Sequence, residues 1–291
     1  LGARPIAFNT VRYSEKLLQK HGISVQTIDF SEIIFKAMHY NDAEKVAAKI
    51  KEIREYGSVP AWISDEVMEK QAKLCLVIDE AIEDLQCDAS TVQCWDSVEN
   101  NYGCATCLAM SMMGDNGKPS ACESDVTGAL SMLAAWLAAG TAPALMDWNN
   151  NIREERNACV SLHCSNFPKS FFQNDVEIEC LDVLGSTLGK ENCFGACKGH
   201  VAAGDMTFIR LTTDDQRGTV KAYLGEGVFR DEVIPTKGGV ANCYIENLQN
   251  LLRYVCENGY EHHVCFVRGH VADILEEALT KYMGIPVYRH R

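Results

Sequence analysis

Two carboxylates of this chain stand where an ordinary surface acid is not expected. Glu123 lies in Pro119-Ser-Ala-Cys-Glu-Ser-Asp125, where it begins the apolar, Ala-rich helical run 126–139, and Asp147 ends the short apolar run 142–146. The first run predicts a buried helix and the second a buried strand. Two carboxylates at the ends of neighbouring buried elements can share a divalent metal or pass a proton across a small substrate. An acid at a helix N-terminus and an unrelated strand-end Asp remain the alternative.

Composition limits the classes of protein that this chain can be. Its 291 residues are 47% hydrophobic and 23% charged, which is ordinary for a globular protein with one large or two smaller domains. The net charge of -13 argues against a nucleic-acid partner and against an anionic membrane. No apolar run is long enough to span a bilayer. The chain does not begin with Met and residues 1–10 lack a signal-peptide pattern, so we expect a part of a longer polypeptide.

The fourteen cysteines indicate buried thiols rather than a disulfide scaffold. The chain is large, and Cys75, Cys94, Cys180 and Cys265 all fall inside predicted elements. Buried thiols behave as small hydrophobes, so we expect a reduced, cytoplasmic protein. Cys104-Ala-Thr-Cys107 has the spacing of a zinc knuckle or redox pair, but no second such pair accompanies it, and its role stays open.

Residues 1–150 predict an α/β domain with parallel strands, which carries Glu123 and Asp147. Asp42 and Ser64 are suitable N-caps for two of its helices. The predicted strands are 5–8, 24–30, 91–94 and 142–146, and the predicted helices are 11–21, 31–39, 42–56, 64–85, 105–113 and 126–139.

Residues 151–291 predict a second domain that is rich in antiparallel strands and carries His163 and His270. Successive β-like runs separated by turn signals favour an antiparallel sheet or a small barrel-like arrangement. The predicted strands are 160–163, 176–181, 201–212, 220–225, 240–245, 263–267 and 285–288, and helices are expected at 246–257 and 271–282.

Histidines supply further candidate ligands. His270 follows a predicted strand and precedes a helix, and Gly269 permits a close backbone approach there. His163 ends another predicted strand. His262 and His263 are adjacent, so their side chains should point to opposite faces of a strand. We expect structural roles for six histidines: His21, His39, His200, His262, His263 and His290. Imidazole together with carboxylate suits Mn²⁺, Fe²⁺, Co²⁺ or Zn²⁺ better than Ca²⁺.

The spacing of these residues does not by itself predict a common site for Glu123, Asp147, His163 and His270. A resemblance to a known family implies one. Six segments carry it, in order along the chain: Gly2-Ala-Arg-Pro-Ile-Ala-Phe-Asn-Thr-Val-Arg-Tyr-Ser-Glu-Lys-Leu-Leu18, Gln93-Cys-Trp95, Ser120-Ala-Cys-Glu-Ser-Asp-Val-Thr-Gly128, Leu145-Met-Asp-Trp-Asn-Asn150, His163-Cys-Ser-Asn-Phe-Pro168 and Gly269-His270. Together they resemble the L-fucose/L-arabinose isomerase family. Members of that family are typically longer, with an additional N-terminal α/β domain, so the resemblance implies that the given sequence starts inside the family's pattern.

The resemblance implies roles for the residues that match it. Glu123 and Asp147 match two acidic ligands of a divalent metal, usually Mn²⁺, which also act on the sugar as catalytic acid and base. His270 matches the family's late histidine ligand, and His163 matches an extra histidine ligand of the arabinose branch. Two further residues are expected on the substrate side: Gln93 for hydroxyl hydrogen bonds and Trp95 for an apolar sugar face, with core packing as the alternative for Trp95.

The activity implied by the resemblance is aldose–ketose isomerisation through a cis-enediol. The substrate would be an L-fucose-, D-arabinose- or L-arabinose-like sugar, and the protein a homo-oligomer in which a neighbour's N-terminal domain helps to cover the sugar. A metal-dependent hydrolase or aldolase with the same ligands remains open. So does a sugar-binding module without turnover.

Overall fold

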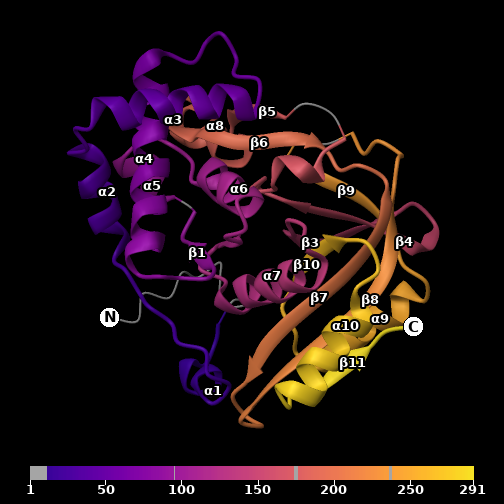
Figure 1. The fold of residues 1–291 in the computed structure, drawn as a ribbon. Coiled ribbons are helices and arrows are strands. Elements are labelled where there is room, and N and C mark those ends of the chain that lie inside the picture. Colours follow the sequence, from indigo (N-terminus) through magenta and orange to yellow (C-terminus); the bar gives the residue numbers. More distant parts are fainter. Residues whose placement is uncertain (1–11, 95, 174–175, 236–237) are drawn as a thin grey trace.

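The computed structural model describes residues 12–94, 96–173, 176–235 and 238–291. Its first part is helical, and the helices are α1 (Glu15–Gln19), α2 (Phe30–Met38), α3 (Ala43–Tyr56) and α4 (Asp65–Asp84). Figure 1 shows three of these helices, α2, α3 and α4, gathered on one side of the molecule, whereas α1 lies apart from them and contacts the long strand Thr219–Arg230. Both α2 and α3 pack against α4.

The starts of three of these helices follow from their capping residues. Asp29 accepts a hydrogen bond from the backbone N–H of Ser31, Asp42 from Lys45, and Ser64 from Val67. These contacts satisfy N–H groups that have no partner within the helix. The capping roles predicted for Asp42 and Ser64 are confirmed.

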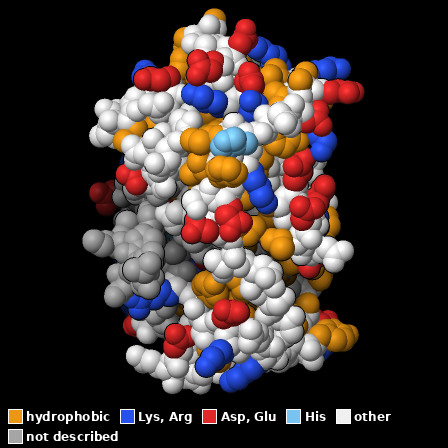
Figure 2. Space-filling model, turned by 90° about the vertical axis from the view of Figure 1, so that its left-hand side faces the viewer, with side chains coloured by type: hydrophobic (Ala, Val, Ile, Leu, Met, Phe, Trp, Pro, Cys, Tyr) orange, Lys and Arg blue, Asp and Glu red, His pale blue; other side chains and the backbone are white. Residues whose placement is uncertain are grey.

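The surface on this side of the molecule mixes acidic and basic side chains with small apolar areas (Figure 2).

A small parallel sheet connects the helices to the rest of the molecule. Its two strands are β1 (Ser90–Val92) and β2 (Ser120–Cys122), and Val92 lies opposite Cys122. Between and after them come α5 (Ser97–Asn101), α6 (Cys107–Asp115) and α7 (Val126–Ala139). Because the strands are parallel, the residues that follow them, Gln93 and Glu123, emerge at the same edge. The short β2 was not predicted, since three residues carry no readable period.

The second part is a nine-stranded mixed sheet in the order β11-β8-β7-β10-β3-β4-β9-β6-β5. An additional pairing of β8 with β9 closes six of these strands into a ring. Most neighbours are antiparallel, as predicted, with β11/β8 and β6/β9 as the parallel pairs among the described residues. The strands are β3 (Ala144–Ile152), β4 (Glu155–His163), β5 (Glu177–Cys180), β6 (Phe194–His200), β7 (Gly204–Asp214), β8 (Thr219–Arg230), β9 (Gly239–Tyr244), β10 (His263–Arg268) and β11 (Val287–Arg289).

Helix α7 covers part of this sheet by packing on β7 and β10, as Figure 1 shows beside the long strand β7. Aromatic side chains fill the core on the inner side of the strands, and Phe208, Phe229 and Phe266 are all almost completely buried there. The remaining short helices are η2 (Lys169–Phe171), α8 (Asp182–Leu188), η3 (Lys190–Cys193), α9 (Leu248–Glu257), α10 (Ala272–Glu277) and η4 (Ala278–Tyr282).

Some predicted elements differ from the structure. The predicted strand 24–30 is wrong: residues 23–29 have no regular structure and Phe30 already begins α2. The predicted strand 142–146 is longer, so Asp147 lies within β3 rather than at its end. The proposed domain boundary after residue 150 also falls inside β3, and the division into two domains stays a prediction. The predicted strand 5–8 lies outside the described residues.

All fourteen cysteines belong to the described part of the chain, and each is a free thiol. Eleven of them are buried, as expected for thiols used as small hydrophobes. Cys104 and Cys107 are both fully buried, and burial raises the pKa of both thiols. No helix among the described residues is both long and apolar enough to cross a bilayer.

Glu99, in α5, predicts a pH-dependent loss of stability. Its side chain is buried, neither oxygen has a hydrogen-bond partner in the described structure, and burial raises its pKa to about 8. The folded chain therefore keeps a proton that the unfolded chain releases near the ordinary glutamate pKa of 4.5. Stability should consequently fall between these two values by about 1.4 kcal/mol per pH unit.

The variant Glu99→Gln should remove the Glu99 contribution, so that its stability falls less steeply with pH than that of the wild type, and it should be more stable than the wild type at pH 8, as measured by urea unfolding at several pH values. Glu44→Gln, which changes an exposed acid at the start of α3, should keep the wild-type slope. An unchanged slope in Glu99→Gln would show that this carboxyl group is solvated in the folded chain.

Candidate metal centre

Strand pairing and one turn bring four candidate donors together. His263 at the start of β10 lies opposite Asp147 of β3, and Asp147 lies opposite Leu162 of β4, one residue before His163. Glu123 comes from the turn between β2 and α7. Glu123, His163 and His263 are buried, and the side chain of Asp147 is largely so.

The centre is arranged around Nε2 of His263. Glu123 Oε2 lies 3.4 Å from this nitrogen and Asp147 Oδ1 lies 3.5 Å from it. His163 Nε2 is 4.0 Å from the same Asp147 oxygen. Donor atoms of Glu123, His163 and His263 all lie within 4.8 Å of one another, as do those of Asp147, His262 and His263. Three of the four residues predicted as metal ligands, Glu123, Asp147 and His163, are therefore neighbours.

His262 also reaches the centre, from its solvent side. Its half-exposed ring places Nε2 3.5 Å from Asp147 Oδ1. The expectation that His262 and His263 point to opposite faces of a strand is wrong. Because His262 lies in a bend just before β10 begins, the alternation of strand side chains does not apply to it.

Glu123 is held in an unusual backbone conformation. Its φ is 62° and that of Ser124 is 57°, both in the left-handed region. Such positions are costly for residues other than glycine and cluster at functional sites. The helix α7 begins only after this turn, with Asp125 as its N-cap. Glu123 therefore precedes the helix, whose bounds, Val126–Ala139, are those predicted.

The other nitrogen of His263 faces a buried ion pair. Nδ1 lies 2.8 Å from Asp125 Oδ2, and Asp125 accepts hydrogen bonds from Arg210 Nη1 at 2.5 Å and Nη2 at 3.0 Å. Asp125 and Arg210 are completely buried. Burial works against ionisation of Asp125, but the Arg210 guanidinium prevails and holds the pKa of that carboxyl well below its usual range.

The remaining groups of the centre also have shifted pKa values. Burial alone would lower the pKa of His263, but hydrogen bonds from its ring to Asp125 and Glu123 raise it to about 9. Burial raises the pKa of Asp147 to about 7, and burial together with the nearby His263 lowers the pKa of His163 to about 4. Acidic and basic groups with such displaced pKa values are typical of functional sites.

The residues fit a divalent cation. Two buried atoms that face each other at the centre have no hydrogen-bond partner in the described structure: Asp147 Oδ1 and His263 Nε2. Buried polar atoms normally have partners, so such a group at one place needs an explanation. Carboxylate oxygens and imidazole nitrogens are ligands of Mn²⁺, Fe²⁺, Co²⁺ and Zn²⁺, and an ion among them would satisfy these donors.

His270 is not among the residues that the fold brings together here. It follows the far end of β10, and at about 3.3 Å per residue Arg268 already lies roughly 16 Å from His263. Its half-exposed ring instead contacts Asp205 at 3.3 Å and Glu226 at 3.2 Å. The glycine turn that suggested His270 is present, with φ of 85° at Gly269, but it faces another part of the molecule.

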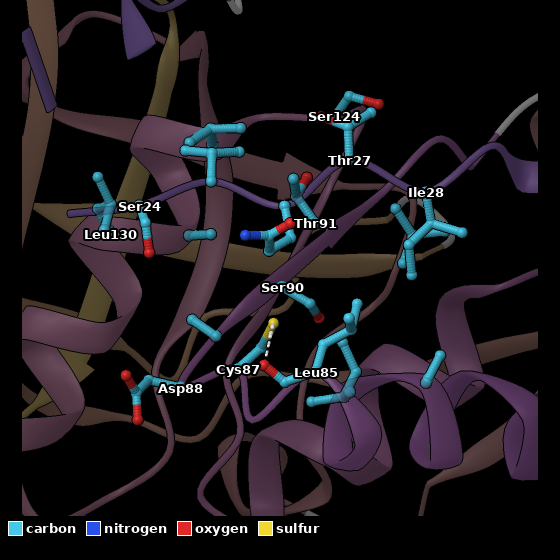
Figure 3. Close-up of a pocket in the computed structure, with 18 of the residues that line it drawn as sticks. Ser24, Thr27, Ile28, Leu85, Cys87, Asp88, Ser90, Thr91, Ser124 and Leu130 are labelled. Carbon is cyan, nitrogen blue, oxygen red and sulfur yellow. Dashed lines mark hydrogen bonds between the residues drawn. The ribbon is translucent and has the colours of Figure 1, made fainter. Parts of the chain in front are cut away.

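Of the two predicted substrate-side residues, Gln93 lies beside the centre. Ser124 Oγ donates to Gln93 Oε1 at 3.1 Å, which ties Gln93 to the turn that carries Glu123. Gln93 and Ser124 also line a cavity of about 530 Å³. Figure 3 shows Ser124, Thr27 and Thr91 on one side of this cavity and Leu85 and Cys87 on the other. Trp95 lies outside the described residues.

Comparisons with known proteins agree with the resemblance seen in the sequence. The family model of the L-fucose isomerase C-terminal domain matches residues 161–291. A sulfoquinovose isomerase of Priestia megaterium is 27% identical over 277 residues, which cover 94% of this chain and 59% of that protein. A sulfoquinovose isomerase of Alkalicoccus urumqiensis is 26% identical over 227 residues, covering 77% of this chain and 49% of that protein.

The similarity extends beyond the part that the family model matches. Residues 161–291 contain His163 and His263, whereas Glu123 and Asp147 precede them. A sulfoquinovose isomerase of a Clostridium species (strain MSTE9) is similar over 94% of this chain, at 27% identity. The chain spans about 59% of the length of the first relatives that it matches. The chain is thus similar to the L-fucose isomerase C-terminal domain over residues 161–291 and to sulfoquinovose isomerases over most of its length.

Proposed function

We propose that this chain carries the metal-binding and catalytic part of an aldose–ketose isomerase. The proposal rests mainly on the buried set of donors around His263 Nε2. Carboxylate oxygens of Glu123 and Asp147 lie 3.4 and 3.5 Å from this nitrogen. The match of residues 161–291 to the L-fucose isomerase C-terminal domain and the names of the similar proteins, sulfoquinovose isomerases, support the reaction class.

The proposed metal ligands are Glu123, Asp147, His263 and His163. His263 takes the role that the sequence resemblance implied for His270, because His263 lies against both carboxylates. Mn²⁺ is the first candidate ion, and the imidazoles also suit Fe²⁺, Co²⁺ and Zn²⁺. A divalent ion bound there supplies Lewis-acid polarisation of the sugar carbonyl.

The two carboxylates are the proposed acid and base. Isomerisation moves one proton from C2 of an open-chain aldose to C1, while the carbonyl moves from C1 to C2 by way of a cis-enediol. Glu123 and Asp147 both lie within 3.5 Å of one nitrogen, so a two-carbon unit beside His263 is within reach of both. One carboxylate removes the proton from C2, and that proton returns at C1. The other carboxylate moves the hydroxyl proton between the oxygens on C1 and C2. Gln93, beside Glu123, is proposed to bind sugar hydroxyl groups.

The proposed substrate is a sugar aldehyde of the kind that this family isomerises. The sequence motifs favour an L-fucose-, D-arabinose- or L-arabinose-like sugar, and the relatives add sulfoquinovose as a candidate. A homo-oligomer and an additional domain contributed by a longer polypeptide are part of the same proposal.

The isomerase proposal predicts ketose formation by the chain. With Mn²⁺ and each of the four sugars, chromatography of the products should reveal a ketose for at least one, with deuterium at C1 when the reaction is run in D₂O. Glu123→Gln should lower the rate by at least about 100-fold, since it removes a proton-transfer group. Glu44→Gln is the control and should retain the rate. Bound Mn²⁺ without a ketose from any of the four sugars would contradict the proposal.

The ligand assignment predicts different effects for His263, which begins β10, and His270, which follows its far end. His263→Gln should weaken Mn²⁺ binding by more than about tenfold, because a donor to the ion is lost. His270→Gln should bind Mn²⁺ as the wild type does, since its ring contacts Asp205 and Glu226 elsewhere. Titration followed by electron paramagnetic resonance of free Mn²⁺ measures both. A larger loss in His270→Gln would restore His270 as the ligand.

A further inference from the structure

Asp125 lies behind His263, on the side away from Glu123 and Asp147. It comes two residues after Glu123, and its Oδ2 lies 2.8 Å from His263 Nδ1. The side chain is completely buried and reaches the centre only through the histidine ring. Its position therefore allows it to act on the centre through His263 alone.

In each of its other contacts, the Asp125 carboxylate accepts a hydrogen bond. Arg210 donates to both oxygens, Thr127 Oγ1 donates to Oδ1 at 3.3 Å, and the backbone N–H of Gly128 donates to Oδ1 at 2.8 Å. An ionised carboxylate has no proton to give. The hydrogen at the Asp125–His263 contact must therefore sit on Nδ1 of the ring.

The Nδ1 proton determines what the opposite nitrogen can do. In a neutral imidazole with hydrogen on Nδ1, Nε2 carries the lone pair. This nitrogen is the one that faces Glu123 Oε2 and Asp147 Oδ1 and that has no hydrogen-bond partner in the described structure. A lone pair directed at two carboxylate oxygens needs a cation between them, which is either a proton on Nε2, giving an imidazolium, or a metal ion.

The surroundings keep Asp125 fixed. Arg210 approaches it with two nitrogens and also contacts Thr127 Oγ1 at 2.9 Å and Glu261 Oε2 at 3.3 Å. Gly128 leaves room for the carboxylate, since a Cβ at that position would lie 2.4 Å from Asp125 Oδ2. The orientation of the carboxylate is thus set from three sides.

We propose that Asp125 is a positioning residue of the metal centre, which holds His263 in the Nδ1–H form so that Nε2 is directed between Glu123 and Asp147 as a ligand. The role rests on the proposed metal centre, and it concerns the ring's tautomer and orientation. A carboxylate behind a ligating histidine commonly acts in this way, and its loss typically weakens metal binding about 10–100-fold.

A purely structural role is the competing explanation, since Asp125 also caps α7 and pairs with Arg210. Ser131 offers a matched control, because its hydroxyl joins the same two elements, α7 and β7. It accepts from the backbone N–H of Leu211 at 2.8 Å and donates to the Thr127 carbonyl at 2.7 Å. Ser131→Ala therefore loosens the same junction without touching His263.

Two measurements on the whole chain test the proposal. Long-range ¹H–¹⁵N spectra of the Zn²⁺-loaded wild type should show His263 protonated on Nδ1 and coordinated through Nε2, with its signals identified by their absence in His263→Gln. Asp125→Asn should weaken Mn²⁺ binding about 10–100-fold. It should also move the ring proton to Nε2 in part of the molecules, as an amide can donate to Nδ1. Ser131→Ala should bind Mn²⁺ with nearly the wild-type affinity.

The outcomes separate this role from the isomerase proposal. A wild-type His263 protonated on Nε2 would overturn the positioning role, and this reading needs no variant to fold. Equal losses of Mn²⁺ affinity in Asp125→Asn and Ser131→Ala would also overturn it, in favour of a structural role. Because neither readout uses turnover, a chain that binds the ion but forms no ketose would refute the isomerase proposal and leave this one standing.

Discussion

The buried ion pair between Asp125 and Arg210 is the interaction on which the rest of the site depends. It joins the first turn of α7 to β7, and through His263 it reaches β10. Burying two charges carries a large desolvation penalty, which is offset only when the geometry is good and the remaining positions are hydrogen-bonded. Here Thr127, Gly128 and His263 complete the contacts of the carboxylate. Removal of one charge would leave the other uncompensated, at about 3–5 kcal/mol.

The same pair explains how a strained turn persists beside it. Glu123 and Ser124 both have positive φ, a conformation that costs roughly 1–3 kcal/mol at each such residue. Asp125 fixes the chain on one side of the turn and β2 on the other, and within the turn the Ser124 N–H donates to the carbonyl of Val92 in β1. The direction of the Glu123 side chain is therefore set by the backbone, which a flexible glutamate on a helix would not achieve.

Sequence patterns within a few residues predicted many of the helices and strands. Which residues meet at the metal centre depends instead on the pairing of strands that are far apart in the sequence. The caps at Asp42 and Ser64 and the apolar run of α7 lie within a few residues of what they determine, and these helices form as predicted. Segment 24–30 has the composition of a strand but pairs with no strand among the described residues, and it is irregular. His263 was missed because its role depends on β10 lying beside β3, and its contact Asp125 is 138 residues away. His270 was favoured by a local glycine turn, which does not determine distance from Glu123.

The donors of the centre come from both sheets, and this has a physical consequence. Glu123 follows the small parallel sheet, whereas Asp147, His163 and His263 belong to the large one. Without a cation, the unpartnered donors at this junction oppose its closure, since buried carboxylates and lone pairs face one another. An ion that binds only the assembled junction stabilises it by about 2.7 kcal/mol at a hundredfold excess over its dissociation constant. Binding of the proposed ion and packing of the two sheets would therefore be one coupled equilibrium, and Asp125 would contribute to both, through His263 and through Arg210.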